Sequence, residues 1–183
     1  MRGLTRLFLA FPLILQVPAA FASEPGREFS GEAVVNTRQG RSRMLLTLVA
    51  NRFTPAEELQ SLATVLENGG QFALMAALEG RRDGQLRLGA TTFPVALVVV
   101  EPLGRDYRYL FLTPRRIRAE EEILEEDSRN YPFGIAVFEV DRFGRGEGRL
   151  HVAAALRIDA DGRVEVEDYN GVDGTIENIK QVR

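Results

Sequence analysis

The sequence contains no cysteine and only one histidine, His151. Without cysteine, the chain has no disulfide bonds, no thiolate ligands for zinc or iron–sulfur clusters, and no cysteine nucleophile. A single histidine also excludes, within one chain, a histidine metal cage and a mechanism that needs two imidazole groups. We therefore expect neither a metal site nor a cofactor.

After residue 22, the sequence has no long apolar run. Residues 1–22 have the three parts of a secretory signal peptide. Arg2 and Arg6 give a positive start, 7–17 is an apolar stretch, and Ala20-Phe21-Ala22 places small residues before a cleavage site. The apolar stretch is shorter than the ~20 residues of a membrane-spanning helix. The sequence therefore predicts cleavage after Ala22 and export to the periplasm or the medium, with no membrane insertion afterwards.

The remaining composition is that of a folded globular protein. Of the 183 residues, 45% are apolar and 27% charged, which excludes disordered, collagen-like and low-complexity classes. Removing the signal peptide, with its two arginines and no acids, changes the formal net charge from −3 to −5. Because an acidic chain has little affinity for phosphate backbones, we expect no nucleic acid partner. We expect a flexible start at 23–28 and one domain over 29–183.

Alternating apolar residues and tight turns predict a mainly antiparallel β protein. The predicted strands are 29–36, 43–50, 86–88, 93–101, 105–112, 133–140, 148–158, 163–169 and 175–182. Residues 96–100 and 135–138 are apolar on both sides, so both faces of these strands should be covered. In 148–158, the even positions are apolar, which predicts one buried face and places His151 on the polar side.

A helical segment interrupts the strands after the second one. Thr54-Pro55-Ala56-Glu57 has the pattern of a capping box, in which the threonine side chain accepts from the first-turn amides. Leucines at helical spacing follow until Asn68-Gly69-Gly70, and a second apolar helical pattern continues to Gly80. The sequence predicts a helical hairpin at 55–79. The expected fold class is α+β, mainly antiparallel β in a curled or barrel-like sheet, with one helical hairpin inserted after the second strand.

The candidate catalytic residues are few. His151 could act as a general base, but no nucleophile motif such as Gly-x-Ser-x-Gly accompanies it, which favours an ordinary strand-surface residue. Glu139, Glu165 and Glu167 could supply two carboxylates for glycoside hydrolysis, which depends on a separation that sequence does not give. Asp159-Ala160-Asp161-Gly162 resembles a calcium loop, but Arg163 follows where an oxygen ligand is needed, so a hairpin turn is favoured.

Two further groups of residues are candidates for binding. Aromatic side chains in the strands could line a ligand cavity, although they more often fill a core; they are Tyr107, Tyr109, Phe111, Tyr131 and Phe133. An acidic run could bind a basic partner, although such runs are more often solvated; its acids are Glu120, Glu121, Glu122, Glu125, Glu126 and Asp127.

Three segments together resemble a family of exported bacterial hypothetical proteins. They are Phe53-Thr54-Pro55-Ala56-Glu57-Glu58, then Tyr131-Pro132-Phe133 with the strand ending at Asp141 and Gly146-Glu147-Gly148, and finally Glu167-Asp168-Tyr169-Asn170. The resemblance covers most of the chain after residue 22. It implies an exported protein of one domain and assigns no activity and no site residues.

The sequence therefore leaves three functions open. The first is a non-enzymatic exported domain that binds a small apolar ligand or a protein partner. The second is a cofactor-free envelope hydrolase that uses carboxylates with His151. The third is an envelope structural or assembly factor that contacts a basic partner through Glu120–Asp127.

Overall fold

The structure, a computed structural model, describes residues 26–37, 40–117, 130–158, 164–169 and 173–183. Its elements are β1 (Arg27–Thr37), β2 (Gly40–Ala50), α1 (Ala56–Leu78), β3 (Gly84–Leu88), β4 (Thr91–Val95), β5 (Leu97–Leu103), β6 (Asp106–Thr113), β7 (Phe133–Val140), β8 (Arg145–Ile158), β9 (Val164–Asp168) and β10 (Asp173–Gln181). Among these elements, no helix is both long and apolar enough to span a bilayer.

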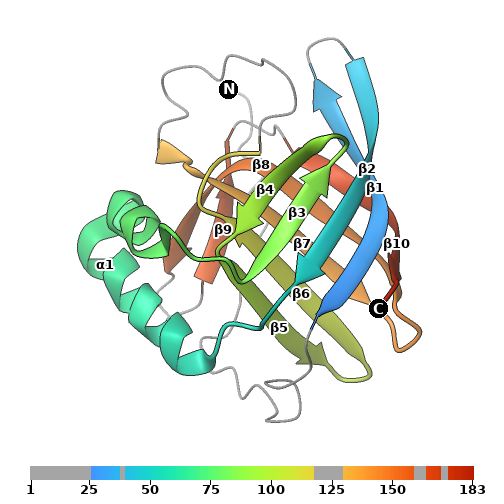
Figure 1. The fold of residues 1–183 in the computed structure, drawn as a ribbon. Coiled ribbons are helices and arrows are strands. Elements are labelled where there is room, and N and C mark those ends of the chain that lie inside the picture. Colours follow the sequence, from blue (N-terminus) through green and yellow to red (C-terminus); the bar gives the residue numbers. More distant parts are fainter. Residues whose placement is uncertain (1–25, 38–39, 118–129, 159–163, 170–172) are drawn as a thin grey trace.

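The strands form one antiparallel sheet that curls into a nearly closed barrel (Figure 1). The strand order is β4-β3-β2-β1-β10-β8-β7-β6-β5, and β9 pairs with β8. β4 and β5, at opposite ends of this order, are consecutive in the chain and are separated only by Ala96. A single bent segment therefore joins the two ends of the sheet. The predicted mainly antiparallel, barrel-like sheet is confirmed, although the predicted strand 93–101 is divided at Ala96.

Aromatic side chains fill the interior of the barrel. Phe29, Tyr109, Phe111 and Phe138 are almost completely buried there, with ring centroids 4.8 Å apart for Phe29–Tyr109 and 5.3 Å for Tyr109–Phe138. Gly148 lies opposite Phe138, and a Cβ at this position would come within 2.4 Å of the Phe138 Cβ. The Tyr109 hydroxyl accepts a hydrogen bond from Arg27, so its one polar group is satisfied.

A second apolar cluster lies on the outer face of the barrel, under α1. Leu66, Leu74 and Leu78 of the helix belong to the same cluster as residues of β5, β6, β7, β8 and β9. Residues 96–100 and 135–138 are all buried, because one side faces the interior and the other faces this outer cluster. The prediction that these strands are covered on both faces is confirmed.

The predicted helical hairpin is wrong: Ala56–Leu78 is one helix with a kink. Gly70 has φ 68° and ψ −164°, outside the helical region, and helical turns resume directly after it. Because glycine has no Cβ, it adopts this positive φ without the usual steric penalty. Asn68-Gly69-Gly70 therefore interrupts the helical conformation at a kink, and no connecting loop separates two antiparallel helices.

The predicted capping box is also wrong, because the Thr54 hydroxyl has other partners. The N-cap residue is Pro55, without a side-chain cap. Thr54 Oγ1 donates to Asp83 Oδ2 at 2.9 Å and accepts from the Val98 amide at 3.1 Å. The buried carboxylate of Asp83 also pairs with Arg52 at 2.9 Å and with Arg81 at 3.0 Å. This network fixes the start of α1 against β3 and β5.

Contrary to the prediction, the even-numbered apolar side chains of 148–158 do not all lie on one face of β8, because they change face halfway along the strand. Leu150 and Val152 belong to the interior cluster, whereas Ala154 and Leu156 belong to the outer cluster. The register with β7 explains the change, because Ile135 pairs with His151 but Phe133 pairs with Ala154. β8 thus has one extra residue in this interval, a β-bulge that reverses the alternation.

Candidate functional site

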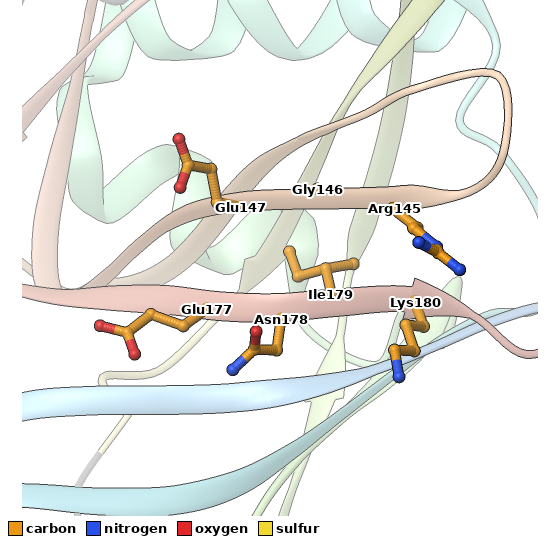
Figure 2. Close-up of a pocket in the computed structure, with 7 residues that line it drawn as sticks. All are labelled: Arg145, Gly146, Glu147, Glu177, Asn178, Ile179 and Lys180. Atoms are coloured by element: carbon orange, nitrogen blue, oxygen red, sulfur yellow. The ribbon is translucent and has the colours of Figure 1, made fainter.

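The candidate binding site is an open groove of about 690 Å³ on the outer surface, between β8 and β10. We call it the β8–β10 groove; its lining residues, shown in Figure 2, are Arg145, Gly146, Glu147, Glu177, Asn178, Ile179 and Lys180. The two cations lie at one end of the lining and the two carboxylates toward the other. The groove therefore presents opposite charges at its two ends.

A bulge in β10 shapes the groove. β8 pairs Gly148 with Ile176 and Gly146 with Ile179, so β10 carries one extra residue in this interval. β1 makes the same shift on the other edge of β10, where Ser30 pairs with Lys180 and Glu32 with Glu177. Asn178 lies within this interval with φ 56°, a left-handed conformation that is uncommon for a residue other than glycine. Bulges of this kind redirect side chains and are frequent beside functional sites.

Arg145 and Lys180, at the cationic end, are directly paired across β8 and β10. Like charges in such a cross-strand pair repel each other and destabilise the sheet. Both side chains are exposed, and neither has an ion-pair partner within the described part of the chain. Two cations are thus held side by side, and no carboxylate of the described residues forms an ion pair with either, since Asp141 in the adjoining turn binds the Arg145 amide.

The described sheet contains two other cross-strand pairs of like charge, both acidic, and an arginine binds a carboxylate of each pair. Glu32 pairs with Glu177, and Arg43 contacts both carboxylates. Glu139 pairs with Glu147, and Arg108 binds Glu139 at 2.7 Å. Since arginines supply counter-charges to both acidic pairs, the Arg145–Lys180 pair, which has no ion-pair partner among the described residues, is the candidate anion site.

Arg108 also pairs with Glu101 at 3.2 Å. Burial raises the pKa of the Glu101 carboxyl above its usual range, and Arg108 opposes that rise. Glu101, Arg108 and Glu139 follow one another across β5, β6 and β7. This row uses Glu139, one of the predicted catalytic carboxylates, in a structural ion pair.

Two exposed apolar side chains adjoin the cationic end of the groove. Phe143, in the turn between β7 and β8, is 71% exposed, and Val182, after β10, is 61% exposed. The Gln181 amide donates to the Gly144 carbonyl at 2.7 Å, so the turn and the end of β10 lie together. The Arg142 guanidinium lies over the Phe143 ring, 4.6 Å from its centroid.

His151 is buried, so the expectation of a strand-surface residue is wrong. Only 1% of it is exposed, and Nδ1 bonds to Asp168 at the end of β9. His151 pairs with Ile135 of the outer cluster and lies where the partner of β8 changes from β10 to β9, so it is on the predicted side of the strand but is covered there. Its Nε2 atom is buried without a hydrogen-bond partner among the described residues. Asp168 could orient the ring for base catalysis, but a substrate would reach Nε2 only if neighbouring side chains moved.

The opposite face of β9 carries a separate polar cluster. The Tyr131 hydroxyl donates to Glu167 Oε1 at 3.1 Å, and its ring lies 5.3 Å from that of Tyr169. Arg157 pairs with the other Glu167 oxygen. Burial and the Glu167 charge raise the pKa of Tyr131 above its usual value. Glu167 therefore also belongs to a structural ion pair.

The predicted aromatic candidates are placed in three different regions. Tyr109 and Phe111 lie in the interior cluster, and Tyr107 packs against it. Phe133 lies in the outer cluster, and Tyr131 lies beside β9. The structure does not bring these five side chains together. The acidic run Glu120–Asp127 and the turn 159–162 lie outside the described residues.

Sequence reasoning missed Arg145, Asn178 and Lys180 as site residues. The available signal was local: Gly146 and Gly148 flank Glu147 beside Arg145. The pairing of Arg145 with Lys180 depends on the bulge at Asn178, which is 33 residues after Arg145 in the chain. No local sequence pattern predicts this bulge. Among the described residues, no group of three or more histidines and acids is arranged to hold a metal ion.

Comparisons with protein-family models, with curated proteins and with solved structures find no match for this chain.

Proposed function

We propose that this protein is an exported, non-enzymatic binding protein that recognises an anionic partner at the β8–β10 groove. The observation that carries the proposal is the exposed Arg145–Lys180 pair, which has no counter-charge among the described residues. A carboxylate or phosphate between these side chains would accept charge-assisted hydrogen bonds and remove their repulsion. The bulge at Asn178 supports the proposal, because strained backbone positions are frequent at binding sites.

The outer surface has more support than the interior as the place of binding. Tyr109, Phe111 and Phe138 occupy the interior, and each is at most 1% exposed. Small barrels of this kind are either filled by side chains or hold one ligand. The aromatic packing favours the filled form, so an apolar ligand inside the barrel has less support than an anionic partner outside it.

Export is part of the proposal and rests on residues 1–22, which have the charge, apolar length and cleavage pattern of a signal peptide. N-terminal sequencing of the protein recovered from the producing cell tests it. A first residue at Ser23 would support export with cleavage, whereas a first residue at Met1 would contradict it.

The binding proposal is tested by nuclear magnetic resonance with two simple anions. Amide shifts are followed while inorganic pyrophosphate, or a tetraglutamate peptide, is added at low ionic strength. We expect shifts confined to the cationic end of the groove, and affinity weakened at least about tenfold by Arg145→Gln combined with Lys180→Gln. The matched control is Arg82→Gln with Arg87→Gln, which removes the same charge from exposed positions elsewhere. Equal losses in both double variants, or no binding of either anion, would refute the proposal.

A hydrolase is the second candidate, because Asp168 holds Nδ1 of His151 and leaves Nε2 without a partner. Such an arrangement fixes the ring orientation that a general base requires. Assays with p-nitrophenyl esters and glycosides, on the protein and on His151→Gln, test this function. Turnover that the variant loses would favour the hydrolase over simple binding.

A further inference from the structure

We propose that the anionic partner is the surface of an anionic lipid bilayer, on which the barrel docks by the end that carries Phe143. This inference rests on the proposed function and names the partner of the same site. The docking surface consists of Arg142, Phe143, Arg145, Lys180 and Val182, which we call the basic tip. Figure 1 shows the turn between β7 and β8 beside the C-terminal end of β10.

The shape of the basic tip favours a bilayer. Phe143 projects from the turn and is the most exposed of the large apolar side chains that the structure describes, at 71%. A peptide lying along the groove would contact Glu147 and Asn178, but it would leave this projecting ring in water. A bilayer surface deforms around a projecting ring and buries it at the boundary between headgroups and acyl chains.

Charge favours the same partner. Among the described residues, Arg145 and Lys180 have no ion-pair partner, and Arg142 is exposed with its guanidinium over the Phe143 ring. Each basic side chain close to an anionic membrane raises the affinity by about fivefold. Because the chain after residue 22 has a formal net charge of −5, the rest of the surface is repelled, and binding is oriented through the basic tip.

The basic tip is held in shape before it binds. Asp141 Oδ1 accepts hydrogen bonds from the amides of Phe143 at 2.8 Å and Arg145 at 3.0 Å. The Gln181 amide binds the turn from the side of β10. A turn fixed in this way loses little conformational entropy when the ring enters the membrane surface.

The test is co-sedimentation of the exported protein, which begins at Ser23, with vesicles of phosphatidylglycerol and phosphatidylcholine, compared with vesicles of phosphatidylcholine alone. Residues 1–22 are left out because their apolar stretch and two arginines would bind anionic vesicles by themselves. We expect binding only to the anionic vesicles, weakened at least about fivefold by Phe143→Ser and further by Lys180→Gln. The matched control is Phe72→Ser, because Phe72 is 60% exposed on α1, away from the basic tip. A Phe143→Ser variant that binds as well as the Phe72→Ser variant would overturn the docking mode.

The outcomes separate the lipid inference from the proposed function. Failure to bind anionic vesicles, with pyrophosphate or tetraglutamate binding retained, would overturn the lipid inference and leave the anion site in place. Failure to bind vesicles, pyrophosphate and the peptide would overturn both. Tighter binding of tetraglutamate than of anionic vesicles would indicate an acidic protein partner instead.

Discussion

The side chain of Gln71 in α1 hydrogen-bonds to the backbone of Leu156 in β8, as a neighbouring strand would. Its amide oxygen accepts from the Leu156 N–H at 3.0 Å, and its amide nitrogen donates to the Leu156 carbonyl. The last pair between β7 and β8 is Phe133–Ala154, so Leu156 lies beyond the end of β7. One helical side chain thus satisfies both backbone groups at the edge of β8 and anchors α1 after its kink.

We expect Gln71→Leu to lower the free energy of unfolding by about 1–3 kcal/mol, because it leaves the Leu156 N–H and C=O groups without partners. Gln60→Leu is the matched control, since Gln60 is exposed on the same helix. Urea unfolding measures both variants. Equal effects would show that the Gln71 hydrogen bonds add nothing to stability.

The helix shows where sequence patterns stop being sufficient. The leucine spacing predicted the helical content of 56–78, but Asn68-Gly69-Gly70 is equally compatible with a helix end and with a kink. What decides between them is the outer face of β5–β8, on which residues before and after the kink pack together. That surface exists only in the folded sheet, so the local sequence could not predict the outcome.

Asp83 should be among the most sensitive polar positions. It is 3% exposed and accepts from Thr54, Arg52 and Arg81. We expect Asp83→Asn to lower the free energy of unfolding by about 3 kcal/mol, because two arginines lose their buried counter-charge. Glu57→Gln, an exposed acid on the first turn of α1, is the control and should change stability little. Thermal and urea unfolding that treat the two variants alike would refute the role of Asp83.

His151 and Asp168 should be energetically coupled. In a double-mutant cycle with His151→Phe and Asp168→Asn, we expect a coupling energy of about 1 kcal/mol or more, because each single change leaves a largely buried partner unpaired. Glu165 lies on the opposite face of β9, so His151→Phe and Glu165→Gln should be additive. Additivity in both cycles would mean that the His151–Asp168 contact does not stabilise β9.

The pH dependence of stability should differ in sign for Glu58 and Glu101. Hydrogen bonds from Arg52 and Arg81 lower the pKa of Glu58 below its ordinary 4.5, so its contribution is present above pH 4.5 and lost as the pH falls through the folded pKa. Burial raises the pKa of Glu101, so its contribution is present below pH 4.5 and falls as the pH rises through the folded pKa. Glu58→Gln should therefore destabilise more at pH 7 than at pH 3, and Glu101→Gln should show the reverse trend. Unfolding curves of both variants at pH 3 and pH 7 test this expectation. The same trend with pH in both variants would contradict the opposite pKa directions of Glu58 and Glu101.

The site was less predictable than the fold, for a physical reason. Strand existence follows from local alternation, and β7 was predicted with its observed bounds, 133–140. Both bulges, near His151 in β8 and at Asn178 in β10, change the register by one residue. A shift of one residue moves side chains to the opposite face, so the change of face after His151 and the Arg145–Lys180 pair could not be read from the pattern. The burial of His151 depends on β9 and on the outer cluster, which cover its side of β8.

The central claim is that Arg145 and Lys180 form an uncompensated cation pair that an anion occupies. Its most direct test is the free energy of unfolding of Lys180→Gln against the unmodified protein at low ionic strength, with and without inorganic pyrophosphate. We predict that the variant is more stable by about 0.2–1 kcal/mol without the anion, and that pyrophosphate stabilises only the unmodified protein. A less stable variant, or equal stabilisation of both proteins by pyrophosphate, would contradict the claim.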